Sequence, residues 1–167
     1  MLVASKQFSG QTKAQSEIIA YWQEICARLD ALPCRSDIDP GVLRSHLAAI
    51  SVVEINALDH IRFRLAGSEV RSIFGQEMRG RWLHEFNGPA ADMWSLGIAA
   101  VRKKVAPVGG IIAREHDQHA WLRLPLASNQ GSALVLCHDM VMPKTHDDGS
   151  DQKEHTIQSD RANTLAA

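Results

Sequence analysis

The sequence is poor in cysteine and free of long apolar runs, and each of these two features excludes a class of protein. Its three cysteines, Cys26, Cys34 and Cys137, are an odd number at wide spacings. This predicts reduced thiols and not a disulfide framework or a cysteine-rich zinc site. The longest apolar stretches, such as residues 96–101, are far shorter than the roughly 18 to 20 residues of a membrane span. The N-terminus lacks the apolar core of a secretion signal, so we expect a cytoplasmic protein with no membrane partner.

An excess of one charge sign is also missing. Lysine and arginine number 18 against 19 aspartates and glutamates, so no overall positive field attracts nucleic acid, and we expect no nucleic-acid partner. The hydrophobic share of 45% and the charged share of 22% are those of a soluble globular protein. A chain of 167 residues is long enough for one domain with its own core.

Composition divides the chain into four segments. We expect a flexible N-terminus over residues 1–11, an amphipathic helix over 12–31, one domain over 32–142 and a disordered polar tail over 143–167. Thr12 and Gln15 have the spacing of a capping box at the start of the helix. Its apolar residues recur every three or four positions, at Ile18, Trp22, Ile25 and Leu29. This stripe can lie on the core of its own chain or pair with a second copy, and periodicity does not choose between the two.

The domain has the residue patterns of short helices and of five strands. Asp39 and Pro40 predict a short helix that runs to about Leu47. Residues 50–55 and 61–65 form a predicted hairpin, with Arg62 and Arg64 on a wet face. Ser68 and Gly75 are placed to begin and to end another short helix. Three further strands are expected over residues 108–115, 120–126 and 132–141.

One longer helix is expected between Pro89 and Pro107, because proline is favoured at a helix start and stops a helix downstream. Its inward residues would be Met93, Trp94, Gly97, Ile98, Val101 and Val105. Two adjacent glycines, Gly109 and Gly110, begin the next strand and indicate a bulge or a close approach of another group.

Several motifs together resemble the bacterial single-domain PAS family that was formerly described as a domain of unknown function. In chain order they are Tyr21-Trp22, Leu32-Pro33, RSDIDP at 35–40, FRLAGS at 63–68, Phe74-Gly75, MRG at 78–80 and LPL at 124–126. The resemblance covers roughly residues 18 to 140. It implies an α+β fold, namely a PAS-like five-stranded antiparallel sheet in the order 2-1-5-4-3 with helices on one face and an N-terminal amphipathic helix.

The same resemblance implies a sensory or regulatory protein that is not an enzyme. In this family the helix before the domain commonly mediates dimerisation, so we expect a homodimer through Ile18, Trp22, Ile25 and Leu29, and a signalling protein as partner. No catalytic residue is carried over from the family.

The domain's large apolar residues predict where a small apolar ligand would bind in such a fold. They are Phe63, Phe74, Trp82, Met93, Trp94 and Trp121. Ordinary core packing explains the same residues and is the interpretation that we favour, with the pocket as the alternative.

No flavin, haem or metal signature is present, so the cofactor, if there is one, is unknown. His116 and His119 are a close pair, but the pattern places them in a surface turn without a third ligand. His138 shares a strand face with Leu134 and Leu136, which favours a buried, hydrogen-bonded histidine over a haem ligand.

Two alternatives remain beside the regulator. The first is a small hydrolase or isomerase with the hot-dog fold, which needs a long central helix and an acid in a cavity, either Glu54 or Glu69. The second is an interaction adaptor with a filled core and no ligand. The sequence contains no nucleophile-elbow, HExxH, Walker or Rossmann pattern to favour an enzyme.

Overall fold

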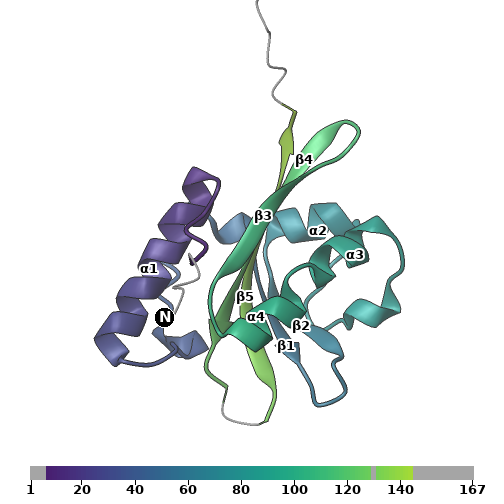
Figure 1. The fold of residues 1–167 in the computed structure, drawn as a ribbon. Coiled ribbons are helices and arrows are strands. Elements are labelled where there is room, and N and C mark those ends of the chain that lie inside the picture. Colours follow the sequence, from purple (N-terminus) through teal and green to yellow (C-terminus); the bar gives the residue numbers. More distant parts are fainter. Residues whose placement is uncertain (1–6, 129–130, 145–167) are drawn as a thin grey trace, which may run out of the picture.

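The computed structural model of the protein describes residues 7–128 and 131–144. A five-stranded antiparallel sheet lies at its centre, with the strands in the order β2-β1-β5-β4-β3. The strands are β1 (Ile50–Ile55), β2 (Ile61–Ala66), β3 (Val108–Ala113), β4 (Asp117–Leu126) and β5 (Ala133–Pro143). Helices α2 (Ser68–Phe74), α3 (Pro89–Ser95) and α4 (Ile98–Lys104) lie on one side of the sheet, and α1 (Lys13–Leu29) lies on the other (Figure 1). The architecture confirms the predicted α+β fold and its strand order.

The sheet packs an apolar core on each face. Alternation along β4 directs Leu122 and Leu124 toward α1, where they meet the buried Ile18 and Trp22. The other face of the sheet carries a second core with residues of α2, α3 and α4, and we call this side the inner face. Strands that are covered on both sides are apolar on both sides, and β1, with five of its six residues buried, shows this most clearly.

Helix α1 is fixed to the sheet by polar as well as apolar contacts. The predicted capping box is present, with the Thr12 hydroxyl accepting from the Gln15 amide. The Gln15 side chain is fully buried, and its Nε2 donates to the carbonyls of Gly110 and Trp121 at 3.2 and 2.9 Å. Seven residues on, Trp22 Nε1 donates to the carbonyl of Pro125 at 3.0 Å. These bonds set both the position and the rotation of the helix.

The apolar stripe of α1 is consequently used inside the chain. Ile18, Trp22 and Ile25 are buried against the chain's own residues, and only Leu29 of the four is exposed, at 41%. Of the two uses that periodicity left open, packing on the chain's own core is the one that the structure shows for these three residues. A homodimer stays a prediction, and it would have to use another face of α1.

The expected long helix between Pro89 and Pro107 is two short helices. Gly97 separates α3 from α4 with a φ of 75°, a left-handed conformation that glycine adopts without strain. A Cβ at this position would lie 2.2 Å from Cζ3 of Trp121, so the ring of Trp121 also requires a glycine here. Val105, expected to face inward, ends α4 and is 53% exposed. The prediction of one continuous helix was therefore wrong.

Two turns also differ from expectation. In place of the expected short helix, residues 40–46 form successive turns that lead into the 3₁₀ helix η2 (Leu47–Ala49), and the Asp39 carboxylate accepts from the Gly41 amide at their start. The turn expected over residues 116–118 lies one to two residues earlier, where Arg114 pairs with Asp117 at the start of β4.

The predicted flexible ends fall mostly outside the described residues. Residues 1–6 and 145–167 are not described, and the predictions made for them lie there. Within the part of the N-terminus that is described, Phe8 is half-buried and packs on the sheet, close enough that a Cβ on Gly109 would lie 2.6 Å from its ring.

Candidate functional site

Three of the six residues expected to line a ligand pocket meet on the inner face. The Phe63 and Trp94 rings are 5.6 Å apart between centroids, the Phe74 and Trp94 rings 5.3 Å, and the Phe63 and Phe74 rings 5.8 Å. Phe86 extends the cluster at 5.8 Å from Phe74. Phe63 and Trp94 are fully buried, so these aromatic rings fill the space between α3 and the sheet.

The other three residues do not stack in this aromatic cluster, although Trp121 packs against the same inner-face core. Trp82 belongs to the segment that borders β2, where it pairs with Arg62 through an isolated bridge and is partly exposed. Trp121 lies on β4 beneath Gly97 and lines an open hollow with Phe8. Met93 is partly buried in α3, and its carbonyl accepts a long hydrogen bond from the side chain of Arg123.

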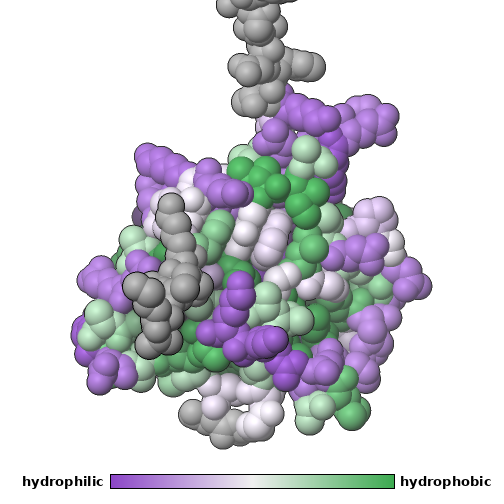
Figure 2. All heavy atoms as spheres, viewed as in Figure 1, coloured by the Kyte–Doolittle hydropathy of each residue, from purple (hydrophilic) through white to green (hydrophobic). Residues whose placement is uncertain are grey.

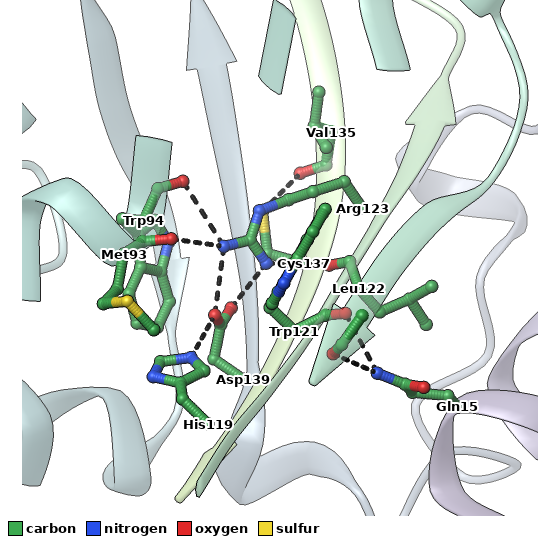
Figure 3. A network of polar contacts seen from close by, with 11 residues as sticks. Gln15, Met93, Trp94, His119, Trp121, Leu122, Arg123, Val135, Cys137 and Asp139 are labelled. Carbon is green, nitrogen blue, oxygen red and sulfur yellow. Dashed lines mark hydrogen bonds and ion pairs between the residues drawn. The ribbon is translucent and has the colours of Figure 1, made fainter. Parts of the chain in front are cut away.

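A buried charged network occupies the inner face beside the aromatic cluster, and it is the main feature that the sequence patterns did not predict (Figure 3). Arg123 on β4 and Asp139 on β5 are both fully buried, and two guanidinium nitrogens lie 2.7 and 3.0 Å from the two carboxylate oxygens. His119, also fully buried, donates from Nε2 to the Asp139 carboxylate at 2.7 Å. We refer to Arg123, Asp139 and His119 as the buried network.

The buried network also holds the end of α3. Arg123 Nη2 donates to the carbonyls of Met93 and Trp94 at 3.4 and 3.3 Å, in the last turn of that helix (Figure 3). Carbonyls in the last turn lack helical partners and attract a cation. Arg123 therefore joins α3, β4 and β5 at one point.

Two opposing effects set the pKa of the Arg123 guanidinium. Burial alone lowers the pKa of its guanidinium, but the charge of Asp139 and the hydrogen bonds to it act in the opposite sense, and the net pKa is raised. The guanidinium also lies between two indole rings, 5.5 Å from the centroid of Trp94 and 5.7 Å from that of Trp121. The arginine is consequently a fixed cation that is paired with Asp139.

Some polar atoms around the buried network have no hydrogen-bond partner among the described residues. They are Trp94 Nε1, His119 Nδ1 and Arg123 Nε. Buried polar atoms are usually paired with protein or with internal water.

The histidines and Cys137 agree only in part with the sequence predictions. The expected surface pair is split, because His116 is exposed while His119 belongs to the buried network. His138 is buried, as predicted, and burial lowers its pKa to about 4. Its Nδ1 has no partner among the described residues, so the expected hydrogen bond is not seen at that atom. Burial raises the pKa of the Cys137 thiol to about 12, and a thiol of this kind is a poor nucleophile.

The two acids considered for a hydrolase do not share a cavity with the aromatic cluster. Glu54 forms an ion pair with Arg64 at 3.3 Å, and Glu69 is exposed in the first turn of α2. The hot-dog alternative also needs one long central helix, and α3 and α4 have seven residues each. No group of three or more potential metal ligands occurs within residues 7–128 and 131–144.

The sequence signal for the buried network was present but ambiguous. Arg123 alternates with Leu122 and Leu124, which usually indicates a strand with one wet side. The additional signal was Asp139 in the neighbouring antiparallel strand, which is mostly apolar. Two opposite charges on neighbouring strands favour a buried pair, but only the cover supplied by α3 establishes it.

Comparison with known proteins gives one match. The family model described as PAS domain matches residues 11–136. No significant match was found among curated proteins or among solved structures. In the described part of the chain, no helix has the length and apolar character needed to cross a membrane.

Proposed function

The chain belongs to the PAS domain family, and from this premise we propose that it is a sensory or regulatory protein that acts by contact with a partner protein. The observation that carries the proposal is the filled inner face. The aromatic cluster and the buried network occupy the space between the sheet and α3, which leaves the outer surface as the means of transmitting a signal.

The edge of β2 is the surface that we propose for this contact. It combines Leu58, His60, Arg62, Trp82 and His84, which we call the β2-edge surface. Leu58 is 74% exposed, the Arg62 guanidinium lies 5.5 Å from the ring of Trp82, and the His60 and His84 rings are 4.6 Å apart. Tryptophan and arginine are the residues most enriched at binding hot spots, which supports this choice.

An exposed apolar residue outside the β2-edge surface supplies a matched control for the test of that surface. On the face seen in Figure 2, apolar side chains gather over the upper part of the sheet, with polar side chains around them. Val141, near the end of β5, is 39% exposed and lies beyond the part of β5 that pairs with β1. Its truncation removes exposed apolar area without touching the β2-edge surface.

A quantitative pull-down tests the proposal. Tagged wild-type protein is used to capture a partner from host extract, and the partner is then titrated against purified variants. Trp82→Ala is expected to weaken binding by about tenfold or more, as truncation of a hot-spot residue does, whereas Val141→Ala leaves it unchanged. Equal affinity of Trp82→Ala and the wild-type protein would refute the β2-edge surface.

We further propose a homodimer through α1, as expected from the family. Because Ile18, Trp22 and Ile25 are buried, the contact would use the exposed side of the helix, where Leu29 is the large apolar residue. Light scattering is expected to give twice the mass of the 18.4 kDa chain, and Leu29→Glu to shift the equilibrium toward monomer. A monomer at every concentration would exclude the dimer.

We propose no catalytic step for this protein and place it in the cytoplasm. The pairing of Glu54 with Arg64 and the raised pKa of Cys137 support the first point. The three unpaired cysteine thiols support the second. Turnover of acyl thioesters that is lost in Glu54→Ala would overturn the first.

A further inference from the structure

A small apolar hollow lies on the face of the sheet opposite to the aromatic cluster. Its volume is about 120 Å³. Its floor includes Val52, Leu65, Leu126 and Leu136, which lie on β1, β2, β4 and β5. The connector between α1 and β1 forms its wall, which includes Arg35 and Leu43.

The wall is held away from the sheet by hydrogen bonds at both ends. The Tyr21 hydroxyl of α1 accepts from the Asp39 amide at 2.8 Å, and His46 Nε2 lies 2.9 Å from the Glu17 carboxylate. At the start of the connector, the Pro33 carbonyl accepts from the Ala127 amide at 2.9 Å. A connector fixed at three points does not collapse onto the sheet, so the hollow is preformed and a ligand need not open it.

The chemistry of the lining residues indicates which class of ligand fits the hollow. Nine of the ten lining residues are apolar, so water finds few hydrogen-bond partners there. The exception is Arg35, which is exposed at the mouth and makes no ion pair with any residue of the described ranges. The neighbouring carboxylates of Asp37 and Asp39 already accept from the amides of Cys34 and Gly41. An apolar interior below one available cation fits a ligand with an aliphatic chain and an anionic head.

We propose that this hollow binds a short aliphatic monocarboxylate, with its chain among the leucines and its carboxylate at Arg35. A cavity of about 150 Å³ holds a benzene-sized molecule, so this hollow suits a chain of about five to six carbons. Burial of that many carbons gives a dissociation constant of about 1 mM. The site lies on the opposite side of the sheet from the buried network and does not depend on the proposed partner contact.

A titration of the full ¹⁵N-labelled chain tests the site, with sodium hexanoate as the probe. Hexanoate is expected to cause saturable shifts of the amides of Leu43, Val52 and Leu136, and to leave the indole signal of Trp94 in place. Acetate, which has the same charge and no chain, is expected to cause none of these shifts. Absence of saturable shifts, or shifts centred on Trp94, would overturn the proposal.

Two arginine variants separate the head-group contact from a general charge effect. Arg35→Gln is expected to weaken the binding of hexanoate by about threefold, since an exposed ion pair contributes modestly to affinity. The binding of hexan-1-ol is expected to stay unchanged. Arg44→Gln removes an exposed arginine of the same connector that does not line the hollow, and is expected to change neither. Equal effects of the two variants would refute a carboxylate site at Arg35.

A filling variant tests the location of the chain. Leu65 is partly buried and lines the hollow. Leu65→Phe places a larger side chain there and is expected to weaken the binding of both hexanoate and hexan-1-ol. The same spectra report whether this variant is folded. If it is not, Arg35→Gln against Arg44→Gln decides the question alone.

Discussion

Arg123 on β4 and Asp139 on β5 form a fully buried two-point ion pair directly beneath the last turn of α3. A buried pair of this kind adds little net stability compared with apolar residues of the same size, because both charges lose their hydration. Its effect is instead to fix the relative positions of the elements that it joins. The pair accepts one arrangement of α3, β4 and β5, and it occupies the side of the sheet on which the aromatic cluster lies.

Removal of one partner of the pair is expected to lower the stability of the fold strongly. Arg123→Met leaves the Asp139 carboxylate buried without its cation, and we expect the free energy of unfolding to fall by about 3 to 5 kcal/mol in urea denaturation. The double variant Arg123→Met/Asp139→Leu, which removes both charges, is expected to lose less than Arg123→Met alone. Losses that simply add between the two sites would show that the residues are not coupled.

Gly97→Ala is expected to destabilise the break between α3 and α4. The left-handed φ of 75° and the predicted contact of 2.2 Å with Trp121 both oppose a Cβ, for a combined loss of about 2 to 4 kcal/mol. Gly75→Ala is the matched control, because its φ is 71° but no atom lies within 4 Å of the added Cβ. We expect it to lose about 1 kcal/mol in thermal or urea unfolding. Equal losses at the two glycines would contradict the close contact with Trp121.

Acid is expected to destabilise the protein through His138. Its pKa falls to about 4 in the folded chain against 6.5 in the unfolded chain, so the unfolded chain binds the extra proton between these values. The stability contributed by the neutral ring is complete above pH 6.5 and is lost as the pH falls toward 4. Between pH 7.5 and pH 5 the loss is about 2 kcal/mol.

Nearby ionisable groups also act on His138, so a variant is needed to isolate its contribution. Asp139, His46, Arg123 and His119 all influence this histidine. Urea denaturation of the wild-type protein and of His138→Gln at both pH values gives the difference that belongs to His138. An unchanged pH dependence in His138→Gln would exclude the explanation.

Cys137 is expected not to react while the chain is folded. Its side chain is fully buried, and burial raises its pKa to about 12, whereas Cys26 and Cys34 are partly exposed. A thiol reagent at neutral pH is expected to modify at most two thiols per native chain and the third only after unfolding. Cys26 is expected to react slowly, because burial raises its pKa as well. Modification of Cys137 before unfolding would show that the sheet opens.

The sequence predicted the elements whose signals are local. The capping box of Thr12 and Gln15, the period-two strands and the helix end at Gly75 all depend on residues within a few positions of one another. The motifs of the first half also placed the chain in its family. These features do not depend on which element covers which face.

The features that the sequence did not predict depend on contacts between distant segments. The break at Gly97 follows from the ring of Trp121, 24 positions later in the chain, and the burial of Arg123 follows from the cover of α3. For the same reason three of the six expected pocket residues stack on one another, whereas Trp121 only joins the same core and Trp82 and Met93 lie outside the stack. Alternation along β4 predicts which residues share a face, but not what lies above that face.

The account depends on the proposal that, in the part of the chain that the structure describes, side chains fill the inner face and leave no room for a tightly held ligand. Native mass spectrometry of the protein purified from its host tests this most directly. We predict that each chain has the mass of the 18.4 kDa polypeptide alone, because a ligand of millimolar affinity in the hollow on the opposite face is lost during purification. A small molecule retained at one copy per chain, and released by a substitution at Phe63 or Trp94, would contradict the account.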